Sequence, residues 1–336
     1  MLLAFSCSEE KLKIAPQGTV DQNILNLTTD EDFFTYSSEI DGNGNSKISG
    51  RKAEKKLGFT SFDDIYNQAL KELSEAEDQD QEKSILNKYS DVVILLDSAY
   101  QPRIGVSIYR KICNRNRIYQ TGDIVHKVLD DQFMVSTDKG KLDELTKLNS
   151  VDNLDLKTFK LLRYSDGGYS GGRTAGTCGN LWNIDYFENN SGCRDDRRVW
   201  AFAQAVFINT GSINGFQRLL PWVNVNIHGQ IRNRLCNWNS YATVLSYRNV
   251  SFTVLSYQNT SSDPIFTSSI RVPYSASSPD FSSGSDSYGI TIFDRSTGTP
   301  IVGENVTIGG PYQFTQIRVE ATSRGVNGNY AVINCQ

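Results

Sequence analysis

Val223-Asn224-Val225-Asn226-Ile227 alternates apolar and polar side chains without a break. Because successive side chains of a strand point to opposite faces of a sheet, this stretch predicts a β-strand with one face buried and one solvated. Further β-type runs follow at short spacing, with Gly, Ser, Asn and Pro between them: Val199–Ile208, Tyr241–Tyr247, Val250–Tyr257, Ile265–Val272, Tyr288–Phe293, Gln316–Ala321 and Tyr330–Ile333. This pattern is typical of a sandwich or barrel, so residues 197–336 are predicted to form an all-β, sandwich-like domain.

Helical periodicity is found earlier in the chain. Ser61-Phe62-Asp63-Asp64 approximates a capping box, and apolar residues then recur at the i, i+3, i+4, i+7 spacing of one helix face: Phe62, Ile65, Ala69, Leu70 and Leu73. Further helices are expected at Gln81–Ser90 and Lys141–Leu148. Short strands are expected at Ile104–Cys113, Arg117–Tyr119, Ile124–Leu129, Gln132–Ser136 and Phe159–Tyr164. Residues 28–164 are therefore predicted as a mixed α/β domain, and the whole chain as α+β.

A change in composition separates these two parts. Lys160 is the last lysine of the chain, and all four tryptophans lie after it. Between the two parts, residues 165–196 are rich in glycine and are predicted to be an irregular loop or linker. Residues 1–27 are predicted to be the remnant of a lipoprotein signal followed by a polar tether.

Ala4-Phe5-Ser6-Cys7 resembles a lipobox, in which small residues precede a cysteine that is diacylated before cleavage. The next residues, Ser8-Glu9-Glu10-Lys11, resemble the acidic surface-export signal of Bacteroidota lipoproteins. Few residues precede Cys7, too few for a complete signal, so we expect the native start to lie upstream unless the chain was trimmed. The resemblance implies a lipid anchor on Cys7 and a place in the outer membrane, exposed at the cell surface.

The cysteine content agrees with export, because an oxidising compartment permits disulfides. Cys178 and Cys193 flank part of the Gly-rich stretch, and closing a loop of that size removes about 3 kcal/mol of unfolded-chain entropy. We predict this pair as one disulfide and Cys236 with Cys335 as a second. Cys113 is then left over and is predicted to be a small buried apolar residue.

Three segments carry a family resemblance: Leu57–Ile65, Ile112–Ile124 and Gly229–Trp238. Each resembles segments of uncharacterised Bacteroidota surface lipoproteins with a domain of unknown function. In those proteins an α/β part precedes a β-rich part, so the resemblance implies the same architecture and address here. It covers about residues 28–260 and brings no known activity or catalytic residue with it.

Composition argues against several classes of function. The net charge is −4 and no concentrated basic stretch occurs, so nucleic acid is not an expected partner. No run approaches the roughly 18 apolar residues of a membrane-spanning helix. His126 and His228, the two histidines, lie in predicted strands without metal-binding spacing, and both are interpreted as structural or exposed. No catalytic residue, metal or cofactor is predicted.

Three near-motifs fit their chemistry poorly. Gly167–Thr174 resembles a phosphate-binding loop with Arg173 in the lysine position, but the residues after it do not begin a helix. Asp41, Asn43 and Asn45 match an EF-hand loop, but Lys52 stands where a bidentate carboxylate is needed, so a polar turn is preferred. Asp97-Ser98-Ala99 resembles an O-glycosylation acceptor, although neighbouring Leu95 and Leu96 suggest burial.

The aromatic residues remain ambiguous, because they can form a sandwich core or stack on sugar faces. Trp182, Tyr186 and Phe187 lie in the presumed loop between Cys178 and Cys193, where no strand is expected to turn them inward. We therefore predict them as ligand-binding residues of a surface binding or adhesion module, with glycan or a surface protein as partner. A structural or accessory subunit of an outer-membrane complex is the first alternative, and an unrecognised hydrolase the second.

Overall fold

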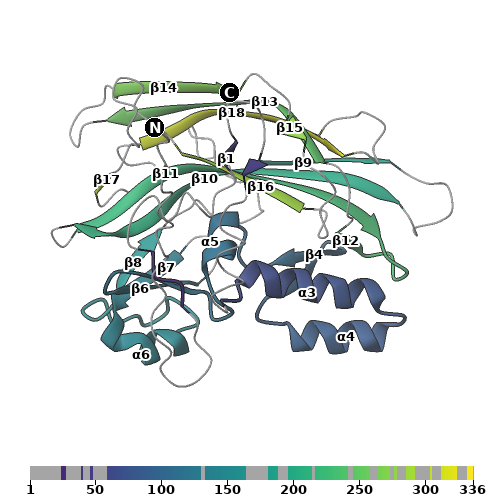
Figure 1. Ribbon diagram of the computed structural model, residues 1–336, viewed down its shortest axis with the longest axis horizontal. Helices are drawn as coiled ribbons and strands as arrows, with labels where there is room; N and C mark the ends of the chain where they lie inside the picture. The colour runs from purple at the N-terminus through teal and green to yellow at the C-terminus, as the bar shows by residue number, and fades with distance from the viewer. Residues whose placement is uncertain are drawn as a thin grey trace, which may run out of the picture.

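The computed structural model describes residues 24–27, 39–40, 46–47, 59–129, 133–163, 181–187, 196–213, 216–240, 245–257, 264–272, 276–277, 285–291, 303–304, 312–323 and 331–335. These residues form three layers (Figure 1): an outer sheet, a central sheet and a layer of helices with a small third sheet. Both helices and sheets are present, so the predicted α+β class is confirmed.

Two helices of the third layer, α3 and α4, begin with a satisfied N-terminal cap. Helix α3 (Phe62–Glu75) starts at Ser61, whose hydroxyl accepts from the amide of Asp64 at 3.1 Å while the Asp64 carboxylate accepts from Ser61. The capping box is therefore confirmed, and the apolar stripe is confirmed except that Tyr66 is buried where Ile65 was predicted. Helix α4 (Gln79–Lys88) follows directly and is capped by Asp78.

A four-stranded antiparallel sheet with its own core completes the third layer. Its strands run in chain order as β5 (Ile118–Thr121), β6 (Ile124–Val128), β7 (Phe133–Asp138) and β8 (Lys160–Arg163). The 3₁₀ turn η1 (Lys139–Lys141) leads into helix α6 (Leu142–Lys147), which packs on this sheet. The apolar core between them consists of Val125, Leu129, Val135, Leu145 and Phe159.

The central sheet is built on two long strands, β10 (Arg197–Ile213) and β11 (Phe216–Arg232), which form an antiparallel pair. Around this pair lie β9 (Leu181–Phe187), β12 (Trp238–Ser240), β16 (Ser285–Thr291) and β17 (Gly303–Glu304). An early hairpin, β3 (Val93–Leu96) with β4 (Ala99–Pro102), joins the same sheet through a parallel contact between β4 and β12. The Trp238 amide donates to the carbonyl of Ser98 at 2.6 Å.

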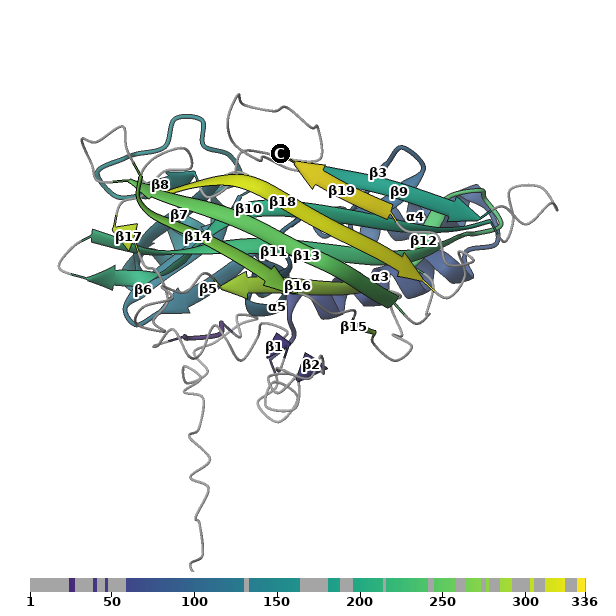
Figure 2. The same ribbon diagram turned by 90° about the horizontal axis from the view of Figure 1, so that it is seen from above.

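The outer sheet covers one face of the central sheet. It contains β13 (Leu245–Tyr257), β14 (Pro264–Val272), β15 (Ala276–Ser277), β18 (Tyr312–Ser323) and β19 (Ala331–Cys335). Strand β10 contacts both β18 and β19, and Figure 2 shows the outer strands lying across the central ones. A separate two-stranded sheet, β1 (Glu39–Ile40) with β2 (Ser46–Lys47), flanks the predicted turn at 41–45, which lies outside the described residues.

Two sequence-based predictions are corrected by the fold. The segment Ile104–Cys113 was expected to be a strand, but it contains helix α5 (Ser107–Ile112). Ile104, Val106 and Ile108 do alternate like a strand, yet burial of Tyr109 and Ile112 on one face of a short helix prevails. The polar tether was placed at residues 1–27, but Ile24, Leu25 and Leu27 are buried, and the backbone of Leu25 and Leu27 bonds to Gln120 of β5, so a tether would end before them.

Within the Gly-rich segment 165–196, the structure describes residues 181–187 and Asp196. The segment contains strand β9, which pairs with β10 over seven residues. Pairing with a long neighbouring strand supplies the backbone hydrogen bonds that the segment lacks by itself. The expectation that no strand passes through Trp182 is therefore wrong.

Candidate binding site

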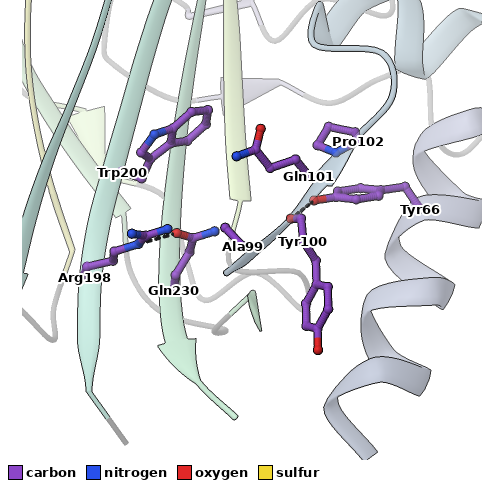
Figure 3. Close-up of a pocket in the computed structure, with 8 residues that line it drawn as sticks. All are labelled: Tyr66, Ala99, Tyr100, Gln101, Pro102, Arg198, Trp200 and Gln230. Atoms are coloured by element: carbon purple, nitrogen blue, oxygen red, sulfur yellow. Dashed lines mark hydrogen bonds between the residues drawn. The ribbon is translucent and has the colours of Figure 1, made fainter. Parts of the chain in front are cut away.

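A small recess opens where the β3–β4 hairpin meets the central sheet (Figure 3). Strand β12, which lies beside the hairpin, is only three residues long and covers little of its edge. The recess has a volume of about 20 Å³, enough for about one water molecule or one small functional group. Its lining residues are Tyr66, Ala99, Tyr100, Gln101, Pro102, Arg198, Trp200 and Gln230. Of these, Gln101 and Arg198 are half-exposed and the others are buried, so these two side chains form the mouth.

The hairpin turn positions one wall of the recess. Asp97 and Ser98 have φ angles of 49° and 59°, the left-handed conformation that a tight two-residue hairpin needs at both turn positions. The Tyr66 hydroxyl donates to the carbonyl of Tyr100 at 3.0 Å and so holds β4 against helix α3. Figure 3 shows that the Tyr100 ring points away from Tyr66.

The opposite wall carries a concentration of positive charge. The Nε of Arg198 donates to Gln230 at 2.7 Å, and the Arg198 guanidinium lies 4.2 Å from the centre of the Trp238 ring. The Arg232 guanidinium lies 4.8 Å from the same ring and forms an ion pair with Asp196 at 3.2 Å. Burial and, secondarily, the nearby Arg232 lower the pKa of Arg198 to about 10, so it stays charged at neutral pH.

Behind the hairpin, a polar network joins the two halves of the chain. The Tyr100 hydroxyl donates to the buried carboxylate of Glu82, and Asn237 donates to the same oxygen at 2.6 Å. Asn233 donates to the Tyr100 hydroxyl at 3.1 Å. Burial, followed by the Glu82 carboxylate, raises the pKa of Tyr100 well above its usual value. This network therefore fixes β4 to the β11–β12 turn.

His126 is a structural residue, as the sequence indicated. Its ring is buried in β6, contacts the hydroxyls of Thr121 at 2.6 Å and Ser136 at 2.7 Å, and stacks on Tyr119. Burial lowers the pKa of His126 to about 3, so the ring is neutral at physiological pH. The Tyr119 hydroxyl in turn donates to the carbonyl of Asn209 at 2.9 Å, which ties the third layer to β10.

Cys113 is also structural. It is a free, fully buried cysteine at the end of α5, and burial raises the pKa of its thiol. A thiol held neutral in an apolar environment is unreactive, since the thiolate is the nucleophile. The prediction that Cys113 is a small buried apolar residue is therefore confirmed.

The three predicted ligand-binding aromatics lie on β9. In its register with β10, Trp182 pairs with Phe202, Tyr186 with Arg198, and Phe187 with Arg197. The fold thus places the Tyr186 position directly beside Arg198 at the mouth of the recess. Within the described sheet β9 pairs with β10 alone, so it is an edge strand.

The predicted cysteine sites stay predictions. Cys7, Cys178 and Cys193 lie outside the described residues. Cys236 lies in the β11–β12 turn with a φ of 66°, and Cys335 is the last residue of β19, paired with Ile317.

Sequence reasoning missed Gln101, Arg198 and Gln230. Arg198 and Gln230 pair across β10 and β11, whereas Gln101 arrives on a hairpin far away in the chain. The segment Gly229–Trp238 drew attention in the sequence and does contain Gln230 and Trp238. Nothing local, however, indicates the β4–β12 contact that forms the recess.

The structure describes one of the three near-motifs, the turn at Asp97-Ser98-Ala99. Asp97 and Ser98 are exposed, and Leu95 and Leu96 are 37% and 43% exposed, so the expected burial of this turn is wrong. The phosphate-loop segment Gly167–Thr174 and the EF-hand-like turn lie outside the described residues. In the part of the chain that the structure describes, no three His, Cys, Asp or Glu side chains gather into a metal site. No described helix has the length and apolar character to cross a membrane.

The comparisons with known proteins assign this chain to no family. No protein-family model matches the chain, and the search of curated proteins gave no match. Among solved structures, the chain is similar to a DUF4848 family protein from Bacteroides thetaiotaomicron VPI-5482. The two chains are 14% identical, the similarity covers 93% of this chain and 96% of that one, and the TM-score is 0.25. A score this low does not establish a shared fold.

Proposed function

We propose that this protein is a glycan-binding module held at the cell surface by a lipid on Cys7. The observation that carries the proposal is the register of β9 with β10, which sets the Tyr186 position beside Arg198 at the mouth of the recess. An aromatic edge strand next to a polar recess combines the two elements of sugar recognition. Aromatic rings cover the C–H face of a sugar, and amide and guanidinium groups bond to its hydroxyls.

The framework around the recess is suited to binding because it is already rigid. The Glu82–Tyr100–Asn237 network fixes one wall, and the Arg198–Gln230 hydrogen bond fixes the other. A site held in place before the ligand arrives loses less conformational entropy on binding. The recess admits one functional group, so a sugar ring would lie over its mouth against β9 and insert a substituent.

The test is a glycan-array screen of the wild-type protein and of Trp182→Ala. We expect the wild-type protein to bind a defined group of glycans, and the variant to lose most of that binding while its melting temperature stays nearly unchanged. A buried tryptophan would instead lose roughly 3–5 kcal/mol of stability on truncation. Trp222→Ala is the matched control, because it truncates the same residue type in β11, which has β10 on one side and β16 on the other. Absence of glycan binding by the wild-type protein would overturn the proposal.

One observation favours the alternative of an accessory subunit in an outer-membrane complex. Strand β3 lies at the other edge of the central sheet, and its residues Leu95 and Leu96 are exposed. Exposed edge strands with apolar side chains are common pairing sites for other proteins. Leu96→Lys would abolish such an association and leave glycan binding intact. Purifying the wild-type protein and this variant from native membranes, and comparing their association with the complex, therefore separates the two functions.

A further inference from the structure

Positive charge exceeds negative charge around Arg198, the charged residue among the described residues that line the recess. Arg198 and Arg232 both lie against the Trp238 ring, and Asp196 pairs with Arg232. No carboxylate is among the described residues that line the recess, and none of the described residues forms an ion pair with Arg198. The buried carboxylate of the polar network, that of Glu82, accepts from Tyr100 and Asn237 behind the hairpin. Arg198 is partly buried and pairs with no carboxylate of the described residues, so its guanidinium can take an external anion as its partner.

Gln101, the other side chain at the mouth, needs a hydrogen-bond donor, whereas Arg198 needs an acceptor. The Oε1 atom of Gln101 is buried and lacks a hydrogen-bond partner among the described residues. An unsatisfied buried acceptor is destabilising until a donor reaches it. A ligand that complements this mouth must therefore present an anionic acceptor to Arg198 and a hydroxyl donor to Gln101.

We propose that the recess binds the carboxylate of an acidic sugar, with Arg198 pairing with the carboxylate and Gln101 accepting from a ring hydroxyl. This inference rests on the proposed glycan-binding function and specifies its ligand class. A sugar acid carries both groups on one ring, which neutral sugars and simple anions do not. The planar guanidinium matches a planar carboxylate through two parallel hydrogen bonds, and the recess has room for one small functional group.

The experiment uses the full chain and a panel of oligosaccharides that end in galacturonate, glucuronate or N-acetylneuraminate. Each is measured by calorimetry beside its carboxyl-reduced form, which keeps the hydroxyls and loses the charge. We expect at least one acidic oligosaccharide to bind at least 10-fold more tightly than its reduced form. Arg198→Gln should weaken that binding about 10- to 100-fold, as expected for loss of a charge-assisted hydrogen bond.

Two variants control for charge and folding. Arg234→Gln removes the same charge from an exposed arginine of the neighbouring turn, whose side chain is 60% exposed, and should leave binding unchanged. Arg198→Lys keeps the charge but lacks the planar fork, and it should bind the acidic sugar several-fold more weakly than the wild-type protein does. If Arg198→Gln fails to fold, the Arg198→Lys result decides the question.

The remaining outcomes each contradict the inference in a different way. Equal binding of acidic and reduced oligosaccharides, unaffected at Arg198, overturns the sugar-acid assignment but leaves the glycan-binding function in place. Equally tight binding of a poly-glutamate peptide, lost in Arg198→Gln, shows a site for acidic peptides instead. No binding of any glycan, here or on the array, overturns both proposals.

Discussion

Acid should unfold this protein in part through His126. The ring is 1% exposed, and burial lowers its pKa to about 3, whereas an unfolded histidine titrates near 6.5. Between these two values the unfolded chain binds a proton that the folded chain does not, so stability falls as the pH decreases below about 6.5. From pH 7 to pH 5 the loss from this residue is about 2 kcal/mol, since each pKa unit corresponds to about 1.4 kcal/mol.

Urea denaturation of the wild-type protein and of His126→Gln at pH 7 and pH 5 measures this contribution. Truncation lowers stability at both pH values, because the stacking on Tyr119 is lost. The decrease in stability from pH 7 to pH 5 should nevertheless be about 2 kcal/mol smaller in the variant. Ser136→Ala is the control, since it removes one hydroxyl but keeps the buried ring and should retain the wild-type pH dependence. Equal pH dependence in the wild-type protein and His126→Gln would refute the argument that burial keeps the ring neutral.

Three further predictions concern other parts of the chain. Burial lowers the pKa of Lys127 to about 8, with the carbonyl of Thr146 accepting from its ammonium group. Lys127→Met should therefore raise the free energy of unfolding at pH 7 by about 1–2 kcal/mol, and it should remove a stability gain that the wild-type protein shows above pH 8 in thermal melts. Ser61→Ala removes the cap of α3 and should lower stability by about 1 kcal/mol in urea titrations, while Ser61→Thr keeps the hydroxyl and should retain most of it. In the native host with a complete leader, Cys7→Ala should move the protein from membrane to soluble fractions, and unchanged membrane association would contradict the lipid anchor.

Local sequence signals predicted those elements that local physics determines. The capping box at Ser61 and the apolar stripe after it specify α3 without reference to the rest of the chain. Alternation between Val223 and Ile227 likewise specifies part of β11. A segment whose sequence fits both a strand and a helix was predicted wrongly. Ile104, Val106 and Ile108 fit a strand, and only burial of Tyr109 and Ile112 against their neighbours favours the helix.

The candidate site could not be predicted, because long-range pairing creates it. Arg198 and Gln230 meet through the register of β10 and β11, and Gln101 meets them only through the contact of β4 with β12. Each of these residues is an ordinary polar residue of a strand when it is considered alone. Trp182, Tyr186 and Phe187 were identified from the sequence, but the strand that sets the Tyr186 position beside Arg198 was not.

The junction between hairpin and central sheet makes the site depend on both halves of the chain. Strand β4 comes from the early α/β part, while β12 and its preceding turn come from the β-rich part. Glu82 and Tyr100 on one side bond to Asn233 and Asn237 on the other, and each side alone would leave buried polar groups without partners. Such groups are costly to leave unsatisfied, so the two halves stabilise each other at this junction. The recess lies beside that junction, and ligand binding there should therefore stabilise the contact between the two halves as well as occupy the site.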